Sequence, residues 1–169
     1  MYSKYFNKDL LAELREQVKE VEFPSVYEPA KWQDVKETSN CLPYALNLKG
    51  IKLERYLTVG AILGLNTLAV YQERRFEEIL MEELKEMGFN VKIWQGSMDR
   101  NQNSRRQKIA LFLAKECRQW HFMRQDADGN WSHQMGIGGR IERLHDLPMG
   151  IMCGGLKVYL HRIYSLKVE

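Results

Sequence analysis

The chain has 169 residues, of which 44% are hydrophobic and 28% are charged, as is usual for a single soluble domain that buries a core. Its formal net charge of +3 is too small to indicate nucleic-acid binding on its own. The three scattered cysteines indicate neither a disulfide framework nor a zinc ribbon, and they favour a reducing compartment.

Two amphipathic helices are predicted, over residues 9–21 and 73–87. In both segments apolar residues recur at intervals of three and four, which is the period of one helix face. Gly88 follows the second segment and is expected to be its C-terminal cap. A third, short helix is predicted to begin near Cys41, because Pro43 suits the first turn of a helix.

The second half of the chain is predicted to be rich in strands. The expected strands are 89–94, 109–114, 119–125, 130–135, 141–144 and 157–167. Helices followed by a meandering antiparallel sheet make an α+β fold, and we expect N-terminal helices packed on a C-terminal antiparallel sheet. The N-terminus lacks the apolar core of a secretion signal, and no stretch approaches the roughly 18 apolar residues of a membrane helix. We therefore expect a cytoplasmic protein with no membrane partner, encoded by a cell or by a phage that delivers it to a host.

Cys41 is the candidate nucleophile. A thiol must lose its proton to attack a carbonyl carbon, and the positive end of a helix favours the thiolate. Thr38 and Ser39 are interpreted as helix caps. Cys117 and Cys153 lack such a setting and are interpreted as structural residues.

His121 and His133 are the candidate base and the group that orients it. The turn signal Asp126-Ala127-Asp128-Gly129 predicts a hairpin, and the two-residue period of strands places both imidazoles on one face, diagonally opposed. His145 and His161 lack this context and are interpreted as structural or surface residues.

Metal sites are the rival interpretation of these residues. Asp126-x-Asp128-Gly129 resembles the start of a calcium loop, but Ile137 stands where the closing glutamate is needed. Cys41, His121 and His133 could bind zinc, but their spacing is unlike structural sites and a fourth ligand is missing. We therefore expect neither a metal nor another cofactor.

The order of Cys41, His121 and His133 resembles the NlpC/P60 branch of the papain-like cysteine peptidases. In that family the nucleophile begins a helix, the base begins a strand, and a third polar residue on the next strand orients the base. The resemblance implies a papain-like fold with Cys41, His121 and His133 in these roles, and it covers residues 36–145. The whole chain, 1–169, is then a single papain-like domain, with a helical N-terminal extension over 1–30 and a catalytic core over 36–167. At the nucleophile this chain has Asn40-Cys41-Leu42-Pro43, where the family commonly has Asp-Cys-Ser-Gly.

An oxyanion hole is also required for acyl transfer. The Cys41 backbone N–H can supply one donor. Asn40, Gln33 and Trp32 are candidates for the second donor and for substrate binding, and the sequence does not choose among them.

The expected function is hydrolysis of an amide bond by a thiol, through an acyl-enzyme, in a peptide, a peptidoglycan stem or a protein. If Cys41 and His121 form a coupled pair, they are expected to exist as thiolate and imidazolium at neutral pH. An acyltransferase or transglutaminase-like enzyme would use the same residues. A non-catalytic phage or host-interaction protein would only bind. Nucleic-acid binding is the least favoured interpretation, because four charges in a polar loop are more often a solvated surface; these are Arg100, Arg105, Arg106 and Lys108.

Overall fold

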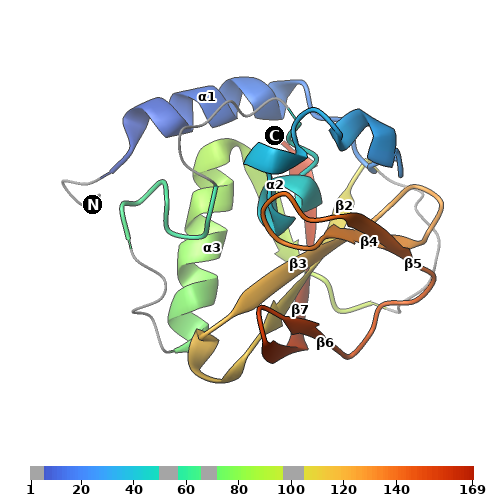
Figure 1. The fold of residues 1–169 in the computed structure, drawn as a ribbon. Coiled ribbons are helices and arrows are strands. Elements are labelled where there is room, and N and C mark those ends of the chain that lie inside the picture. Colours follow the sequence, from blue (N-terminus) through green and yellow to red (C-terminus); the bar gives the residue numbers. More distant parts are fainter. Residues whose placement is uncertain (1–5, 50–56, 66–71, 97–104) are drawn as a thin grey trace.

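The computed structural model describes residues 6–49, 57–65, 72–96 and 105–169, and it confirms the α+β class (Figure 1). The helices are α1 (Lys8–Lys19), α2 (Cys41–Ala45) and α3 (Glu73–Met87). The strands are β1 (Phe89–Ile93), β2 (Gln107–Leu113), β3 (Trp120–Gln125), β4 (Trp131–Gln134), β5 (Ile141–Leu144), β6 (Gly150–Cys153) and β7 (Leu156–Val168). Short 3-10 helices cover Pro29–Trp32, Lys36–Thr38 and Lys115–Cys117. None of the helices in the described ranges has the length and apolar character needed to cross a bilayer.

Helices α1 and α3 form where the apolar periodicity predicts them. Helix α1 begins at Asn7, whose side chain accepts a hydrogen bond from the Leu10 N–H, and its apolar stripe is buried. Helix α3 ends at Gly88, which has the positive φ of 108° expected of a C-terminal cap. Both helices contribute to one apolar cluster with α2 and the sheet, so α1 is an integral part of the core.

The sheet is antiparallel throughout, in the order β1-β7-β2-β3-β4-β5, with β6 paired to the beginning of β7. Strand β2 lies near its centre and is buried along its whole length, because apolar clusters cover both faces. Ile109 and Leu111 face the helices, whereas Ala110 and Phe112 face a second, smaller cluster. Figure 1 shows α1 and α3 beside the sheet and α2 in front of it.

Strand β6 was not predicted, although its hairpin carries a clear signal. Gly154 and Gly155 both have positive φ, 58° and 80°, and connect β6 directly to β7, as expected of a two-residue hairpin turn. The turn reaches the residue that precedes β3: a Cβ atom on Gly154 would lie only 2.2 Å from Nε2 of Gln119. Strands β7 and β2 separate β6 from β3 in the sheet order, so the sheet must curl strongly for this contact to form.

A buried carboxylate joins α3 to the segment 57–65. The backbone N–H groups of Gly60, Ile62 and Leu63 all donate to the Glu83 carboxylate. These three N–H groups lie outside any strand or helix, so the Glu83 carboxylate supplies the acceptors that they need. The bonds also hold the apolar segment 57–65 against α3. Burial raises the pKa of Glu83, and the three N–H groups oppose this shift.

Glu83→Gln is expected to destabilise the fold by about 2 kcal/mol, because an amide N–H₂ would face donors that now reach a carboxylate. Urea unfolding measures this change. Glu82→Gln is the matched control, since Glu82 is an exposed neighbour on the same helix. Equal stability of the two variants would contradict a structural role for Glu83.

Candidate functional site

The candidate nucleophile stands at the first residue of α2, as predicted, but its cap is Asn40 and not Thr38 or Ser39. Asn40 has an extended backbone, and its Oδ1 accepts the N–H of Leu42 at 2.9 Å. The Thr38 hydroxyl donates to the Val35 carbonyl, and the Ser39 hydroxyl donates to the Asn40 carbonyl. Asn40 ranks with serine as an N-cap, so the sequence contained the correct residue one position later.

Strands β3 and β4 separate where α2 packs against them. Their ladder pairs Arg124 with Ser132 and Gln125 with Trp131, and it ends there. Beyond the ladder, the backbone N–H of Phe122 faces the Cys41 sulfur and favours its anion. The nucleophile helix therefore meets β3 at an edge that β4 leaves unpaired.

Burial controls the charge of Cys41. The residue is 5% exposed, and loss of hydration raises the pKa of its thiol to about 12, against the opposing effect of the Phe122 N–H. The expected lowering of this pKa by the helix N-terminus is wrong for the structure as it stands. Burial therefore favours the neutral thiol at Cys41.

The two histidines lie on one face of the hairpin, as predicted, and their rings are in contact. His121 Nε2 and His133 Nδ1 are 2.7 Å apart, and both side chains are buried. The register of β3 and β4 makes the two residues diagonal neighbours. Their contact bridges the gap at which the two strands separate.

Glu142 extends this pair into a chain of three side chains, and sequence reasoning missed it. It stands directly opposite His133 in the β4–β5 ladder, and its Oε2 is 3.4 Å from His133 Nε2. An ionised carboxylate only accepts hydrogen bonds, so His133 carries its proton on Nε2 and accepts at Nδ1. His121 must then donate from Nε2, which leaves its Nδ1 as the basic nitrogen. Glu142 lies in the short strand predicted over 141–144, but its position opposite His133 follows only from the register of β4 and β5.

Cys153 is the second residue that sequence reasoning missed. It was assigned a structural role, yet its sulfur lies 4.0 Å from His121 Nδ1, the nitrogen that the tautomer chain leaves free. Cys153 ends β6, and the curl of the sheet brings it to β3. It is also close enough to Cys41 for a charge on one thiol to disfavour a charge on the other.

Burial also keeps the imidazoles neutral. It lowers the pKa of His121 to about 3, and the neighbouring charge of His133 acts in the same direction. The pKa of His133 is lowered by burial, while Glu142 raises it. The pKa shifts of Cys41 and His121 both oppose the thiolate–imidazolium pair expected at neutral pH.

The three oxyanion candidates occupy different settings. The Asn40 side chain donates from Nδ2 to the Leu57 carbonyl, so both of its polar groups are used. Trp32 is buried against Tyr44, with ring centroids 4.8 Å apart, and within the described ranges its Nε1 has no hydrogen-bond partner. Gln33 is exposed after the first 3-10 helix.

The rival metal motif has another structural role. Asp126 turns inward and accepts hydrogen bonds from Arg124, Ser25 and Ser132. Within the part of the chain that the structure describes, no three His, Cys, Asp or Glu side chains are arranged to hold a metal ion.

The basic residues proposed as phosphate contacts bind neighbouring protein groups where they are described. Arg106 donates to Ser165 and to the Asn90 side chain. The Lys108 ammonium lies 3.9 Å from the centre of the Trp94 ring. Arg105 is exposed, and Arg100 lies outside the described residues.

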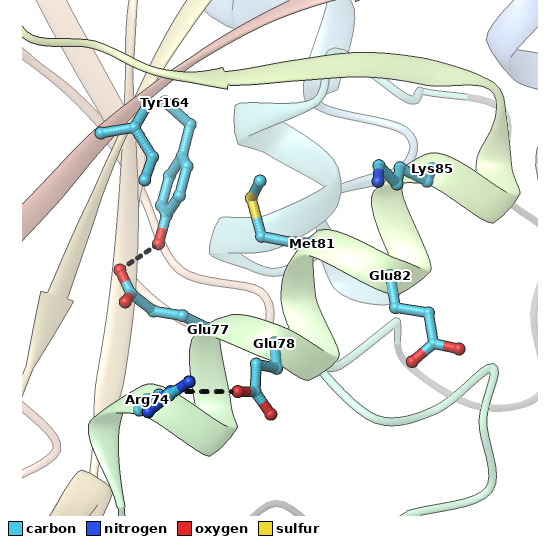
Figure 2. A pocket seen from close by; sticks show the side chains of 8 residues that line it. Arg74, Glu77, Glu78, Met81, Glu82, Lys85 and Tyr164 are labelled. Carbon is cyan, nitrogen blue, oxygen red and sulfur yellow. Dashed lines mark hydrogen bonds and ion pairs between the residues drawn. The ribbon is translucent and has the colours of Figure 1, made fainter.

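A separate hollow of about 370 Å³ lies against α3. Figure 2 shows its lining side chains, among them Met81, Glu77 and Tyr164, whose hydroxyl donates to the Glu77 carboxylate. The walls of this hollow come from α3, β1 and β7, whereas the candidate catalytic side chains stand on α2, β3 and β4.

Comparison of the chain with protein-family models, with curated proteins and with solved structures gives no match.

Acid is expected to destabilise the protein through its buried histidines. The folded pKa of His121 is lowered, so between pH 6.5 and about 3 the unfolded chain binds more protons than the folded chain. Stability is therefore complete above pH 6.5 and is lost as pH falls towards 3. Urea unfolding at several pH values measures this loss.

The matched comparison for this prediction is His121→Gln against His145→Gln. The first variant removes the buried imidazole and should flatten the acid dependence of the unfolding free energy. The second variant removes an exposed imidazole and is the control for the loss of a histidine. A wild-type slope in His121→Gln would contradict a buried neutral His121.

Proposed function

We propose that the protein is a papain-like thiol hydrolase of the NlpC/P60 type that cleaves an amide bond in a peptide, a peptidoglycan stem or a protein. Cys41 is the nucleophile, His121 the general base, and His133 the group that orients it. The observation that carries the proposal is the hydrogen-bonded chain from Glu142 through His133 to His121. It orients a buried imidazole on β3, the strand against which α2 packs, and leaves Nδ1 of His121 as the basic nitrogen.

The chemistry needs proton transfer during attack, since neither partner is charged at rest. The Cys41 thiol gives its proton to His121 Nδ1 as the sulfur bonds to the substrate carbonyl carbon. The Cys41 backbone N–H donates to the developing oxyanion. The leaving amine takes the proton from the imidazolium, and water then hydrolyses the thioester.

His133 and Glu142 stabilise the charged intermediate state of the base. When His121 Nδ1 gains a proton, its Nε2–H still donates to His133 Nδ1, and the Glu142 carboxylate lies at the far end of the chain. A negative group at that distance favours the imidazolium without competing for the thiol proton.

Two alternatives share this structure. In an acyltransferase or transglutaminase-like enzyme an amine would replace water in the second step, with the same residues. A non-catalytic binding protein is favoured by one observation, the burial of Cys41 with a thiol pKa of about 12. An assay of substrate cleavage is therefore needed to separate an enzyme from a binding protein.

Cys41→Ala and His121→Ala are expected to reduce cleavage to the background rate. His133→Ala should retain activity roughly 100-fold below the wild type, and Glu142→Gln activity roughly tenfold below it, because both changes remove orientation and leave the base in place. The assay incubates each variant with a pool of peptides and peptidoglycan stem peptides, and mass spectrometry detects the cleaved products.

Cys117→Ala is the control, since it removes another buried thiol outside the proposed site. Full activity of Cys41→Ala would exclude Cys41 as the nucleophile. Complete loss in His133→Ala with retained activity in His121→Ala would reverse the roles of the histidines. No cleavage by the wild type of any substrate in the pool would favour the binding protein.

A further inference from the structure

We infer that Cys153 is a modification site: a second thiol served by His121, which small soft electrophiles and hydroperoxides reach before Cys41. Its reactivity follows from the contact with His121 alone. The consequence for catalysis rests on the function proposed above, because modification of Cys153 would engage the base that Cys41 needs.

The first support is the identity of the thiol beside the basic nitrogen. The tautomer chain leaves Nδ1 of His121 as the acceptor, and the Cys153 sulfur lies 4.0 Å from that atom. A thiol next to a buried, correctly oriented imidazole can transfer its proton as it attacks. Burial raises the pKa of both Cys153 and Cys117, and the charge of Glu73 raises that of Cys117 further. The contact with an imidazole nitrogen distinguishes Cys153.

The second support is access from solvent. Cys153 is partly exposed, whereas Cys41 is 5% exposed. Cys153 ends β6 just before the two-glycine turn, on the hairpin face opposite to the exposed side chains of Met152 and Tyr159. It shares the inner face with Ile151 and Val158, so its own partial exposure makes its sulfur more accessible than that of Cys41.

The proposed oxidation is balanced with a hydroperoxide as the oxidant. The Cys153 thiol gives its proton to His121 Nδ1, and the sulfur attacks one peroxide oxygen. An S–O bond forms and the O–O bond breaks, so that the sulfur loses two electrons and the peroxide gains them. With hydrogen peroxide the leaving group is hydroxide, which takes the proton from the imidazolium, so the products are a sulfenic acid and water.

The modified sulfur would then block the base. A sulfenic acid on Cys153 adds a hydroxyl next to His121 Nδ1, which can donate to that nitrogen and occupy its lone pair. Cys41 would lose its proton acceptor without being modified itself. A thiol reductant should restore the free base, because sulfenic acids are reversible.

The test is site-resolved alkylation of the native protein by iodoacetamide at neutral pH. Peptide mass mapping should show Cys153 labelled about tenfold or more faster than Cys41 and Cys117, and slowed about tenfold in His121→Ala. Cys117 reports any general opening of the fold in the variant, and the Cys153 rate is expressed relative to it. Glu142→Gln removes the carboxylate that fixes the tautomers of His133 and His121. This variant should slow the alkylation of Cys153 by a smaller factor than His121→Ala does.

Equal relative labelling of Cys153 in the wild type and His121→Ala would overturn the inference, as would faster labelling of Cys41 than of Cys153. A second arm treats wild type and Cys153→Ser with hydrogen peroxide, and each cleavage rate is compared with that of its own untreated sample. Loss in the wild type with retention in Cys153→Ser supports the block of the base, whereas equal loss with oxygen found on Cys41 refutes it. If no form of the protein cleaves any substrate, the proposed function fails, and the labelling result still decides the reactivity of Cys153.

Discussion

The geometry of the candidate site depends on one buried guanidinium, that of Arg124. Its Nε pairs with Asp126 at 2.8 Å, and its terminal nitrogens donate to the backbone carbonyls of Tyr44 and Val26. Removing one partner of a fully buried ion pair is costly, so this arrangement tolerates little displacement. Arg124 follows His121 by three residues on β3, and Tyr44 follows Cys41 by three residues on α2. A single side chain therefore ties the helix of Cys41 to the strand of His121.

The prediction from sequence succeeded where one segment determines its own structure. The apolar period of α1 and α3, the cap at Gly88 and the Asp126–Gly129 turn are local signals, and all of them hold. Glu142 and Cys153 were missed because their roles depend on register and on the curl of the sheet, which no short window of sequence contains. The fold class was thus accessible from the sequence, and the family resemblance stays a prediction.

The charge state of the site shows which of two electrostatic effects dominates. The end of a helix is worth about 0.3–1 kcal/mol for an exposed charge in its first turn and up to about 2 kcal/mol for a partly buried one. One unit of pKa corresponds to about 1.4 kcal/mol. Helix α2 has five residues, so its contribution is at the lower end. Desolvation of Cys41 is larger and raises the pKa of the thiol to about 12. The sequence therefore predicted the position of the Cys41 thiol at a helix N-terminus, whereas burial in the folded protein determines its pKa.

Under the proposed function, the same burial makes substrate entry and activation of Cys41 a single event. Cys41 and His121 are both neutral because water and charge are excluded, so whatever admits a polar amide also admits the hydration that stabilises a thiolate and an imidazolium. The partly exposed member of the cluster is Cys153, on a hairpin whose strand β6 pairs only with the beginning of β7 within the described residues. Under the proposed function, a substrate of Cys41 has to replace the contact between the Cys153 sulfur and His121 Nδ1.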